Sequence, residues 1–269
     1  MFWFTKKTNL TLPSRDIHSH LLPGVDDGFK TADESIVAIN TMLENGVKEF
    51  VFTPHMNPDV YPNESEAHFR EVYESFKETL FSTLSLRQGA RRSRSSEHVR
   101  KEYPKGEGVD KTSPSPLGEG LGVRLAAEYM VVKGFETRVA DHADELLTYP
   151  DGSILIEMSY MYRSRNFEDA IFELVMAGLK PIVAHPERYL YMVDSLGEID
   201  HWVDMGARLQ LNLLSLTGQY GAASVRIMKH LLKHGLYSFV ATDLHSNAQL
   251  ARILETKVDA KLLKSLPIG

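Results

Sequence analysis

The chain contains no cysteine. This absence excludes disulfide bonds, thiolate nucleophiles and zinc–thiolate sites, so any metal must be held by imidazole and carboxylate groups. Long apolar runs are also missing, and none approaches the roughly 18 residues that a membrane-spanning helix needs. The opening stretch, MFWFTKKTNLTLPSRD, places a short apolar segment before its lysines, which is the wrong order for a signal peptide. We therefore expect a cytoplasmic protein without membrane insertion.

An excess of positive charge is lacking as well. Thirty Lys and Arg residues stand against 36 Asp and Glu, which gives a net charge of −6. This balance provides no general attraction for nucleic acid or anionic membranes, so neither is expected as a partner. Hydrophobic residues make up 43% of the 269 positions, enough for a substantial core, and the length suits one α/β barrel domain.

Apolar strands and amphipathic helices alternate along the chain. The pattern predicts strands at 15–20, 49–55, 123–130, 153–159, 181–189, 208–216 and 237–245. Between and after them it predicts helices at 31–45, 64–80, 139–148, 166–180, 194–205 and 221–235, and a C-terminal helix. Seven such units with near-continuous apolar strands indicate a parallel sheet covered on both faces. A (β/α) barrel fits better than a doubly wound sheet, because no glycine-rich dinucleotide turn follows the first strand.

Residues 87–124 differ in composition from the rest. The stretch has nine Lys and Arg against five Asp and Glu, with six Gly and three Pro. Apolar residues are too sparse to offset the entropy of ordering, so we expect a flexible, basic, Gly/Pro/Ser-rich insertion within a single domain spanning 1–269. It is either a tolerated surface loop or a basic tether for an acidic partner.

Ionisable residues recur where the predicted strands end. These positions are His18 and His20 in the first strand, His55 in the second, Glu128 in the third, Glu157 in the fourth, His185 in the fifth, and Asp243 and His245 in the seventh. In a parallel barrel all strand C-termini lie on one face, where barrel enzymes place their sites. One histidine at a strand end is an ordinary satisfied side chain, but the convergence of all of them indicates a shared site.

The type and number of these side chains favour a metal cluster. With Asp27, from the turn of DIHSHLLPGVDDG, the set contains five imidazoles and four carboxylates, more than one ion can use. Two or three divalent ions such as Mn, Fe or Zn suit this N/O set. Close ions lower the pKa of a bridging water and clamp a tetrahedral substrate, and their residual charge favours an anion such as a phosphate monoester. The neighbouring Asp26 is expected to point elsewhere and serve the turn.

Other polar residues allow two interpretations each. Arg188 in HPERY lies within reach of a phosphate oxygen for a bidentate contact, or forms a surface ion pair. The loop YMYRSR, 160–165, adds phosphate contacts or is a solvated βα loop. His230 and His234 have the i, i+4 spacing of a helical metal site, but they lack the glutamate of HExxH and fit a helix surface better.

Six segments together resemble a known family: DIHSHLLPGVDDG, TPH, AAEYM, AHPERYLYM, LQLNLLSLTGQYG and TDLH. They are similar to the polymerase-and-histidinol-phosphatase (PHP) superfamily, and within it to the bacterial protein-tyrosine phosphatases of capsule and exopolysaccharide loci, the CpsB/YwqE type. The similarity covers nearly the whole chain except about 87–124. It implies a distorted seven-stranded (β/α) barrel, the PHP fold, with a trinuclear metal centre that is usually active with manganese.

The resemblance also implies roles for residues. One ion would take His18, His20, Glu128 and Asp243; a second would share Glu128 and add Glu157 and His185; the third would take Asp27, His55 and His245. Arg188 matches the family's phosphate-binding arginine. Besides this arginine, Asp27 and His55 are expected to act in catalysis.

The implied function is metal-dependent hydrolysis of phosphotyrosine, on the tail of a cognate tyrosine autokinase that controls capsule or exopolysaccharide synthesis. Without cysteine a phosphocysteine intermediate is impossible, so direct attack by water is the expected route. Two alternatives use the same centre. One is a small-molecule phosphoesterase of the histidinol-phosphatase type, and the other is a non-catalytic, metal-stabilised scaffold that binds a kinase tail. The sequence leaves the oligomeric state open.

Overall fold

The computed structural model describes residues 7–98 and 121–267, and parallel strands form its centre. A six-stranded sheet has the order β10-β9-β8-β7-β6-β4, and a three-stranded sheet has the order β2-β3-β5. All neighbours in both sheets are parallel. Their bounds are β2 Arg15–Ser19, β3 Glu49–Phe52, β4 His55–Met56, β5 Gly122–Leu125, β6 Glu128–Met130, β7 Ser153–Glu157, β8 Lys180–Ala184, β9 Arg208–Asn212 and β10 Tyr237–Ala241. The predicted α/β class with parallel strands is confirmed.

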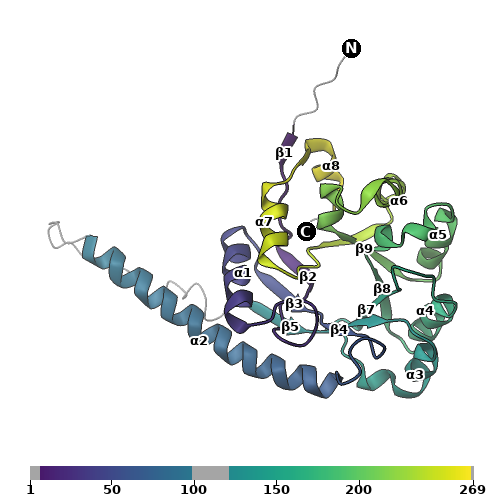
Figure 1. The fold of residues 1–269 in the computed structure, drawn as a ribbon, viewed down its shortest axis with the longest axis horizontal. Coiled ribbons are helices and arrows are strands. Elements are labelled where there is room, and N and C mark those ends of the chain that lie inside the picture. Colours follow the sequence, from purple (N-terminus) through teal and green to yellow (C-terminus); the bar gives the residue numbers. More distant parts are fainter. Residues whose placement is uncertain (1–6, 99–120, 268–269) are drawn as a thin grey trace, which may run out of the picture.

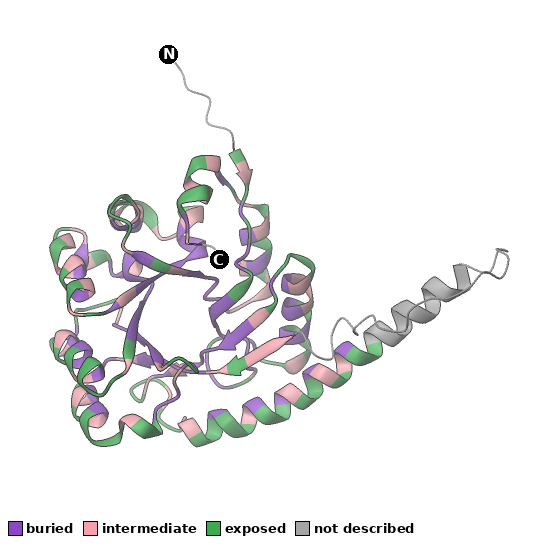
Figure 2. Ribbon diagram, turned by 180° about the vertical axis from the view of Figure 1, so that it is seen from behind, coloured by how far each residue is buried: buried purple, intermediate pink, exposed green. Residues whose placement is uncertain are grey.

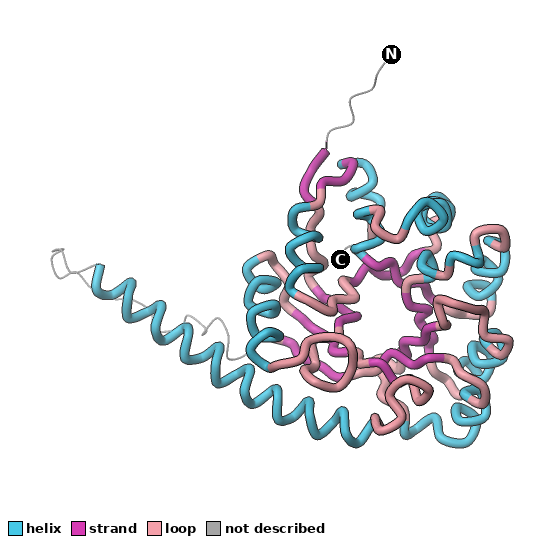
Figure 3. Tube along the Cα trace, in the orientation of Figure 1, coloured by secondary structure: helices cyan, strands magenta, loops and turns pink. Residues whose placement is uncertain are grey.

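Backbone hydrogen bonds join the two parallel sheets at both edges. On one side, Asp243 N donates to His18 O at 2.8 Å, and Ser19 forms an isolated parallel bridge with Leu244. On the other side, the pairing of β3 with β5 continues into that of β4 with β6 through bonds such as Ala126 N to Phe52 O at 2.9 Å. The strands therefore surround a common interior, as the tube in Figure 3 shows.

Two predicted strands are each divided in the structure. The expected strand 49–55 is interrupted after Phe52, and the expected strand 123–130 is interrupted after Leu125, so that β3 and β5 lie in one sheet and β4 and β6 in the other. Pro54 lies in the first break, where it has no N–H to donate to a ladder. Because both strands break at the same level, their pairing continues across the break, with Glu128 N donating to Pro54 O at 3.0 Å.

The helices lie outside the strands (Figures 1 and 3). Their bounds are α1 Ala32–Glu44, α2 Glu66–His98, α3 Phe135–His142, α4 Phe167–Met176, α5 Leu196–Asp204, α6 Gly221–Lys233, α7 Asn247–Glu255 and α8 Ala260–Ser265. The start of α1 is the predicted capping box, in which the Thr31 side chain accepts from Glu34 N. Its end is also as predicted, at Asn45 followed by Gly46 with φ of 95°.

The core lies between this helical layer and the strands, and Figure 2 shows the strands largely buried. Each helix packs its apolar face inward, as with Phe167 of α4 and Trp202 of α5, whose rings meet edge to face at 4.8 Å. Most of the central strands are buried on both faces, and all five residues of β7 are buried. This double burial explains why the strands read as continuous apolar runs.

The predicted insertion at 87–124 differs from the structure at both ends, while residues 99–120 lie outside the described part of the chain. Residues 87–98 continue α2 instead of leaving it, and Gly122–Leu125 form β5 beside β3. The helix continues because arginine, glutamine and alanine have good helix propensity and the first proline comes only at Pro104. The segment that leads to Glu128 therefore starts as β5 and, after the break at Ala126, continues as β6.

Smaller elements were not predicted. A two-stranded antiparallel sheet pairs β1 Lys7–Asn9 with β11 Lys257–Asp259, and thereby fastens the start of the described chain to its end. The expected helix 139–148 lies earlier, at α3, and is followed by a 3-10 turn, Ala143–Glu145. Within the described residues, no helix is long and apolar enough to cross a membrane.

Candidate metal centre

All nine predicted ligand residues gather at the C-terminal ends of the parallel strands. They are His18, His20, Asp27, His55, Glu128, Glu157, His185, Asp243 and His245. Their positions in the strands differ slightly from the expectation, because His20 follows β2 and His55 begins β4. The topology brings together residues that lie more than 220 positions apart in the sequence.

Four of these residues form what we call the inner cluster: His18, His20, Glu128 and Asp243. The two Nε2 atoms lie 3.2 Å apart, each is 3.2–3.3 Å from Glu128 Oε2, and each is 3.2–3.3 Å from Asp243 Oδ1. The four side chains are 0–2% exposed. Four electron-rich groups therefore converge on one point that water hardly reaches.

The far nitrogen of each imidazole determines its tautomer. His18 Nδ1 lies 3.0 Å from Gln210 Oε1, and His20 Nδ1 lies 2.7 Å from Asp26 Oδ2. Because both partners are acceptors, each Nδ1 carries the proton and each Nε2 presents a lone pair to the cluster. Such outer partners are typical of metal-binding histidines.

The inner cluster fits a divalent ion. Tetrahedral ligands about 2.0–2.1 Å from an ion lie about 3.3 Å from one another, which matches the separations among these atoms. Two lone pairs and two carboxylates at this spacing repel each other unless a cation lies between them. Glu128 Oε2 and Asp243 Oδ1 are buried without a hydrogen-bond partner among the described residues, so both retain a free coordination position.

A second group is centred on the other side of Glu128. His55 Nδ1 lies 3.1 Å from Glu128 Oε2 and 3.0 Å from Glu157 Oε1. His185 Nε2 approaches Glu128 Oε1 at 3.0 Å. Glu157 Oε2 is buried and accepts no hydrogen bond from the described residues. Glu128 thus faces both groups.

Three residues form what we call the outer cluster: Asp27, His55 and His245. Asp27 Oδ1 lies 3.5 Å from His55 Nε2 and 3.6 Å from His245 Nε2. His245 Nδ1 donates to Asp243 O at 2.9 Å, which leaves its Nε2 lone pair facing Asp27. Their side chains are more accessible than those of the inner cluster, with 61% of Asp27, 13% of His55 and 17% of His245 exposed.

Arg188 supplies a cation at the rim of the centre. Its Nη1 donates to Asp243 Oδ2 at 2.7 Å. The guanidinium lies over the rings of Tyr160, at 4.2 Å, and Tyr220, at 4.7 Å. Burial alone would lower the pKa of Arg188, but Tyr160 and Asp243 raise it, so the group stays charged. A fixed, desolvated guanidinium beside the cluster is suited to bind an oxyanion.

The buried carboxylates are held ionised. Burial by itself would raise the pKa of Glu128, but the neighbouring imidazoles of His18 and His55 hold it well below its ordinary range. In Asp243 burial is likewise outweighed, chiefly by His18, and its pKa is also well below the usual value. Both groups are therefore ready to coordinate a cation without losing a proton.

Backbone conformation marks two of the ligands. Among the described residues, the only non-glycine positions with positive φ are His185, at 32°, and Asp243, at 49°. Such conformations cost free energy in residues with a side chain and persist where the surroundings impose them. Each follows an apolar strand closely and turns its side chain into the centre, which links the strain to the site.

Sequence reasoning missed the residues that support the ligands. Asp26, expected to point elsewhere, accepts from His20 Nδ1 and from His55 N, although it also serves the turn by accepting from Gly28 N at 2.9 Å. Gln210 of β9 accepts from His18 and from His185 N at 3.2 Å. A polar residue within the apolar run RLQLN was the available signal.

The two weaker candidates lie away from the cluster. His230 and His234 project from α6, and His230 Nε2 lies 3.0 Å from Asp200 Oδ1 of α5 in the helical layer. Arg163 forms ion pairs with Glu168 and Glu198. Neither the His230–His234 pair nor Arg163 contacts any of the nine predicted ligand residues.

Parallel strands that carry imidazoles and carboxylates at their C-terminal ends, with an arginine at the rim, form an arrangement typical of metal-dependent hydrolases. The chain belongs to the CpsB/CapC family of capsular polysaccharide synthesis, whose model matches residues 14–102 and 118–262. The resemblance seen in the sequence motifs is thereby confirmed.

Named relatives are consistent with this family. The chain is 27% identical over 232 residues to the tyrosine-protein phosphatase YwqE of Bacillus subtilis, covering 86% of this chain and 77% of that protein. It is 24% identical over 265 residues to the tyrosine-protein phosphatase CpsB of Streptococcus pneumoniae, covering 93% of each. A solved structure described as YwqE from Bacillus subtilis and CpsB from Streptococcus pneumoniae, unique metal-dependent tyrosine phosphatases, matches with a TM-score of 0.65 and 26% identity, over 93% of this chain and 89% of that one.

Proposed function

We propose that this chain is a metal-dependent protein-tyrosine phosphatase that hydrolyses phosphotyrosine in a protein substrate. The observation that carries the proposal is the inner cluster, where two imidazole lone pairs and two carboxylates converge at 3.2–3.3 Å beside a half-buried arginine. Such a cluster needs cations, and cations with Arg188 beside them select a phosphate ester. The named relatives, all tyrosine phosphatases, support this substrate class.

The proposed cofactor is a cluster of three divalent ions, manganese first and iron or zinc as alternatives. The inner cluster would hold one ion, Glu128 with Glu157 and His185 a second, and the outer cluster a third. The geometry adds that His55 also faces Glu128 and Glu157 through Nδ1. When bound, such ions supply Lewis acidity and lower the pKa of water.

The chain's own residues orient the substrate and the ligands. Arg188 would bind equatorial phosphate oxygens, and Asp243 with the two tyrosine rings keeps its guanidinium in place. Asp26 and Gln210 keep His20 and His18 in the tautomers that present Nε2. Asp27 and His55, the other two residues predicted to act in catalysis, lie at the accessible side of the centre. The phenolate leaves with a pKa of about 10 and needs little help from a general acid.

The proposal also covers the barrel type, the domain extent and the substrate protein. The two linked sheets would form a distorted (β/α)7 barrel of the PHP type, because strands β2 to β10 count as seven once β3 joins β4 and β5 joins β6. One domain would span 1–269. The substrate would be the tail of a tyrosine autokinase in capsule or exopolysaccharide synthesis. The cytoplasmic location and any oligomeric assembly stay predictions.

The test is phosphate release from a phosphotyrosine peptide by protein loaded with Mn²⁺. We expect turnover that requires the metal and is lost when Arg188 is replaced. A parallel measurement of kcat/KM for histidinol phosphate separates the small-molecule alternative, which would show the higher value there. Full metal content without any turnover of phosphotyrosine would overturn the proposal.

A further inference from the structure

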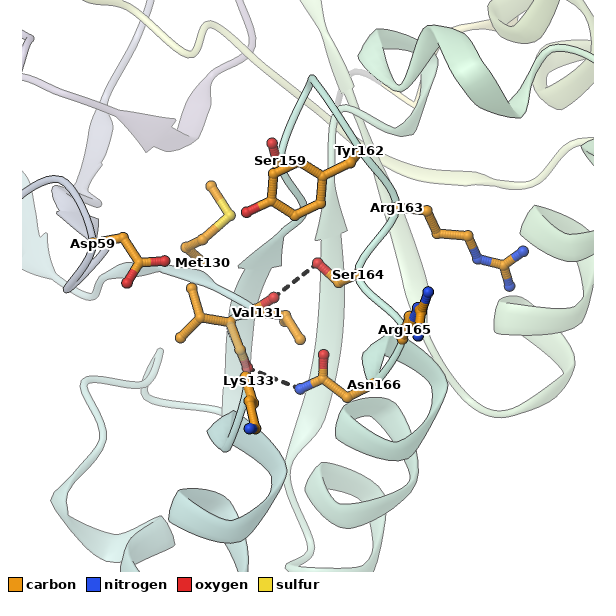
Figure 4. Close-up of a pocket in the computed structure, with 11 residues that line it drawn as sticks. Asp59, Met130, Val131, Lys133, Ser159, Tyr162, Arg163, Ser164, Arg165 and Asn166 are labelled. Carbon is orange, nitrogen blue, oxygen red and sulfur yellow. Dashed lines mark hydrogen bonds between the residues drawn. The ribbon is translucent and has the colours of Figure 1, made fainter.

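A pocket of about 430 Å³ lies between the loops that follow β6 and β7, the strands that carry Glu128 and Glu157. Its walls are residues 130–133 on one loop and Ser159 with residues 162–166 on the other, with Asp59 on one side (Figure 4). The two walls begin two residues beyond Glu128 and Glu157 respectively. Because a strand advances about 3.3 Å per residue, the near edge of the pocket is about 7 Å along the chain from these ligands. A residue close to a bound phosphotyrosine in the same peptide can reach it.

The pocket is held in shape by contacts between its walls. Ser164 Oγ donates to Val131 O at 2.8 Å, and Asn166 Nδ2 donates to Val132 O at 2.8 Å. Both bonds appear in Figure 4 and fasten the loop after β7 to the loop after β6. The site is therefore preformed, which reduces the entropy lost when a ligand binds.

The lining combines an apolar floor with a cationic end. Met130 and Val132, both half-buried, form part of the floor, and the ring of Tyr162, 61% exposed, lies at one end. Lys133 and Arg165 lie toward the other end in Figure 4. A flat apolar body with a strongly anionic end matches this arrangement, since the ring packs on the floor and the anion meets the cations.

The two cations have no partner within the described part of the chain. Neither Lys133 nor Arg165 forms a hydrogen bond or ion pair there, and both are exposed. Arg163 differs, because Glu168 and Glu198 already neutralise it. Asp59 is the one carboxylate among the lining residues, and it lies on a different side from the cations.

We infer that this pocket is a second phosphotyrosine subsite, which binds a neighbouring phosphotyrosine of the same substrate while the first occupies the metal centre. The inference rests on the proposed function. An extended peptide advances about 3.3–3.6 Å per residue, so the second phosphotyrosine lies two to four positions along the chain. Its phosphate, with a charge of about −1.5 to −2, meets Lys133 and Arg165, while its ring packs on Met130 and Val132.

The test measures binding to the full chain loaded with Mn²⁺. Fluorescent peptides carry a non-hydrolysable phosphonate analogue of phosphotyrosine at the first position, and alanine, glutamate, tyrosine or a second phosphonate analogue two to four residues away. We expect the doubly substituted peptide to bind about tenfold tighter than the alanine peptide, with glutamate and tyrosine in between. Equal affinity for all peptides would overturn the inference.

A pair of variants locates the effect. Lys133→Ala with Arg165→Ala should abolish the gain from the second phosphonate and leave binding of the alanine peptide unchanged. The matched control, Lys229→Ala with Lys233→Ala, removes the same charge from exposed positions of α6 and should retain the gain. Equal losses in both double variants would indicate long-range attraction and would contradict a built subsite.

A hydrolysis assay tests the proposed function independently of the second subsite. Phosphate release from a singly phosphorylated peptide does not involve the second subsite. Turnover of that peptide without any binding gain from a second phosphonate would refute the subsite and leave the phosphatase intact. A binding gain that is lost in Lys133→Ala with Arg165→Ala supports the subsite whether or not turnover occurs.

Discussion

The inner and outer clusters use the same kinds of ligand in different surroundings. The inner cluster is 0–2% exposed, and its ligand atoms are 3.2–3.3 Å apart. In the outer cluster Asp27 is 61% exposed and lies 3.5–3.6 Å from its imidazole partners. The neighbouring aspartates of the DDG turn divide between the two regions. Asp26 is buried against His20, whereas Asp27 faces the solvent side.

This difference in burial indicates that the two clusters have different roles. Buried, fixed ligands bind an ion tightly, since their electrostatic attraction is not screened by water. The open ligands of the outer cluster have room for exchange with water and with substrate oxygens. We expect the inner ion to be structural as well as chemical, and the outer ion to be the first to leave.

The largest effect is expected from Glu128→Ala. This carboxylate faces both the inner cluster and the group around Glu157, so its loss should remove two ions and lower kcat/KM by about 10³-fold or more, several kcal/mol of metal-derived stabilisation. Phosphate release and metal content measured on the same sample provide the check. Near-normal turnover would show that Glu128 bridges nothing.

A smaller loss, about 10²-fold in kcat/KM, is expected from His245→Ala, because the outer cluster is open and retains Asp27 and His55. Elemental analysis should find one ion fewer than in the unaltered protein, with the inner ion retained. A brief treatment with a mild chelator should reproduce the same state. Simultaneous loss of all ions would contradict a difference between the two clusters.

The next largest effect, on metal affinity, is expected at Asp26, the carboxylate that accepts from His20 Nδ1. Asp26→Asn keeps the volume but removes the charge that orients His20, so metal affinity should fall by about 10–100-fold. The measurement is the Mn²⁺ concentration that gives half-maximal activity. Asp33→Asn, in the first turn of α1, is a matched control away from the centre and should change nothing. An unchanged Mn²⁺ requirement in Asp26→Asn would assign Asp26 to the turn alone.

The smallest predicted effect concerns the hydrogen-bond network around the buried Glu187. Tyr237 Oη donates to the buried Glu187 at 2.8 Å, and Glu187 also accepts from Asn212 N and from Ser215 Oγ. Tyr237→Phe should lower the free energy of unfolding by about 1–2 kcal/mol, because a buried acceptor loses one donor. Denaturant unfolding of the metal-loaded protein measures it. A large drop in activity instead would place this network within the chemistry.

The sequence predicted much of the fold because local signals agreed. Apolar runs identified the parallel strands, and Thr31 with Glu34 identified the start of α1. The sequence could not predict the strand interruptions, because they depend on how neighbouring strands pair. The interruption at Pro54 occurs together with one at Ala126 in the neighbouring strand, and only the paired structure shows why they coincide. The pairing of β1 with β11 is likewise a contact between distant segments.

For the candidate site, the type and position of the ligands were accessible from the sequence. The nine residues that it predicted lie together, since parallel strands end on one face. The supporting partners were not accessible. Gln210 and Asp26 act through a single hydrogen bond to an imidazole, and no spacing rule reports which side chain will reach that nitrogen. The positive φ angles of His185 and Asp243 could not be predicted from the sequence either.

The point of attachment of residues 99–120 has a practical consequence. The preceding segment belongs to α2, and β5 begins at Gly122, beside the start of β3 at Glu49. These starts lie at the end of the strands opposite to the ligands. A fluorophore, an affinity handle or a deletion placed there would modify the molecule at a distance from its chemistry, so this is the natural position for immobilising a working enzyme.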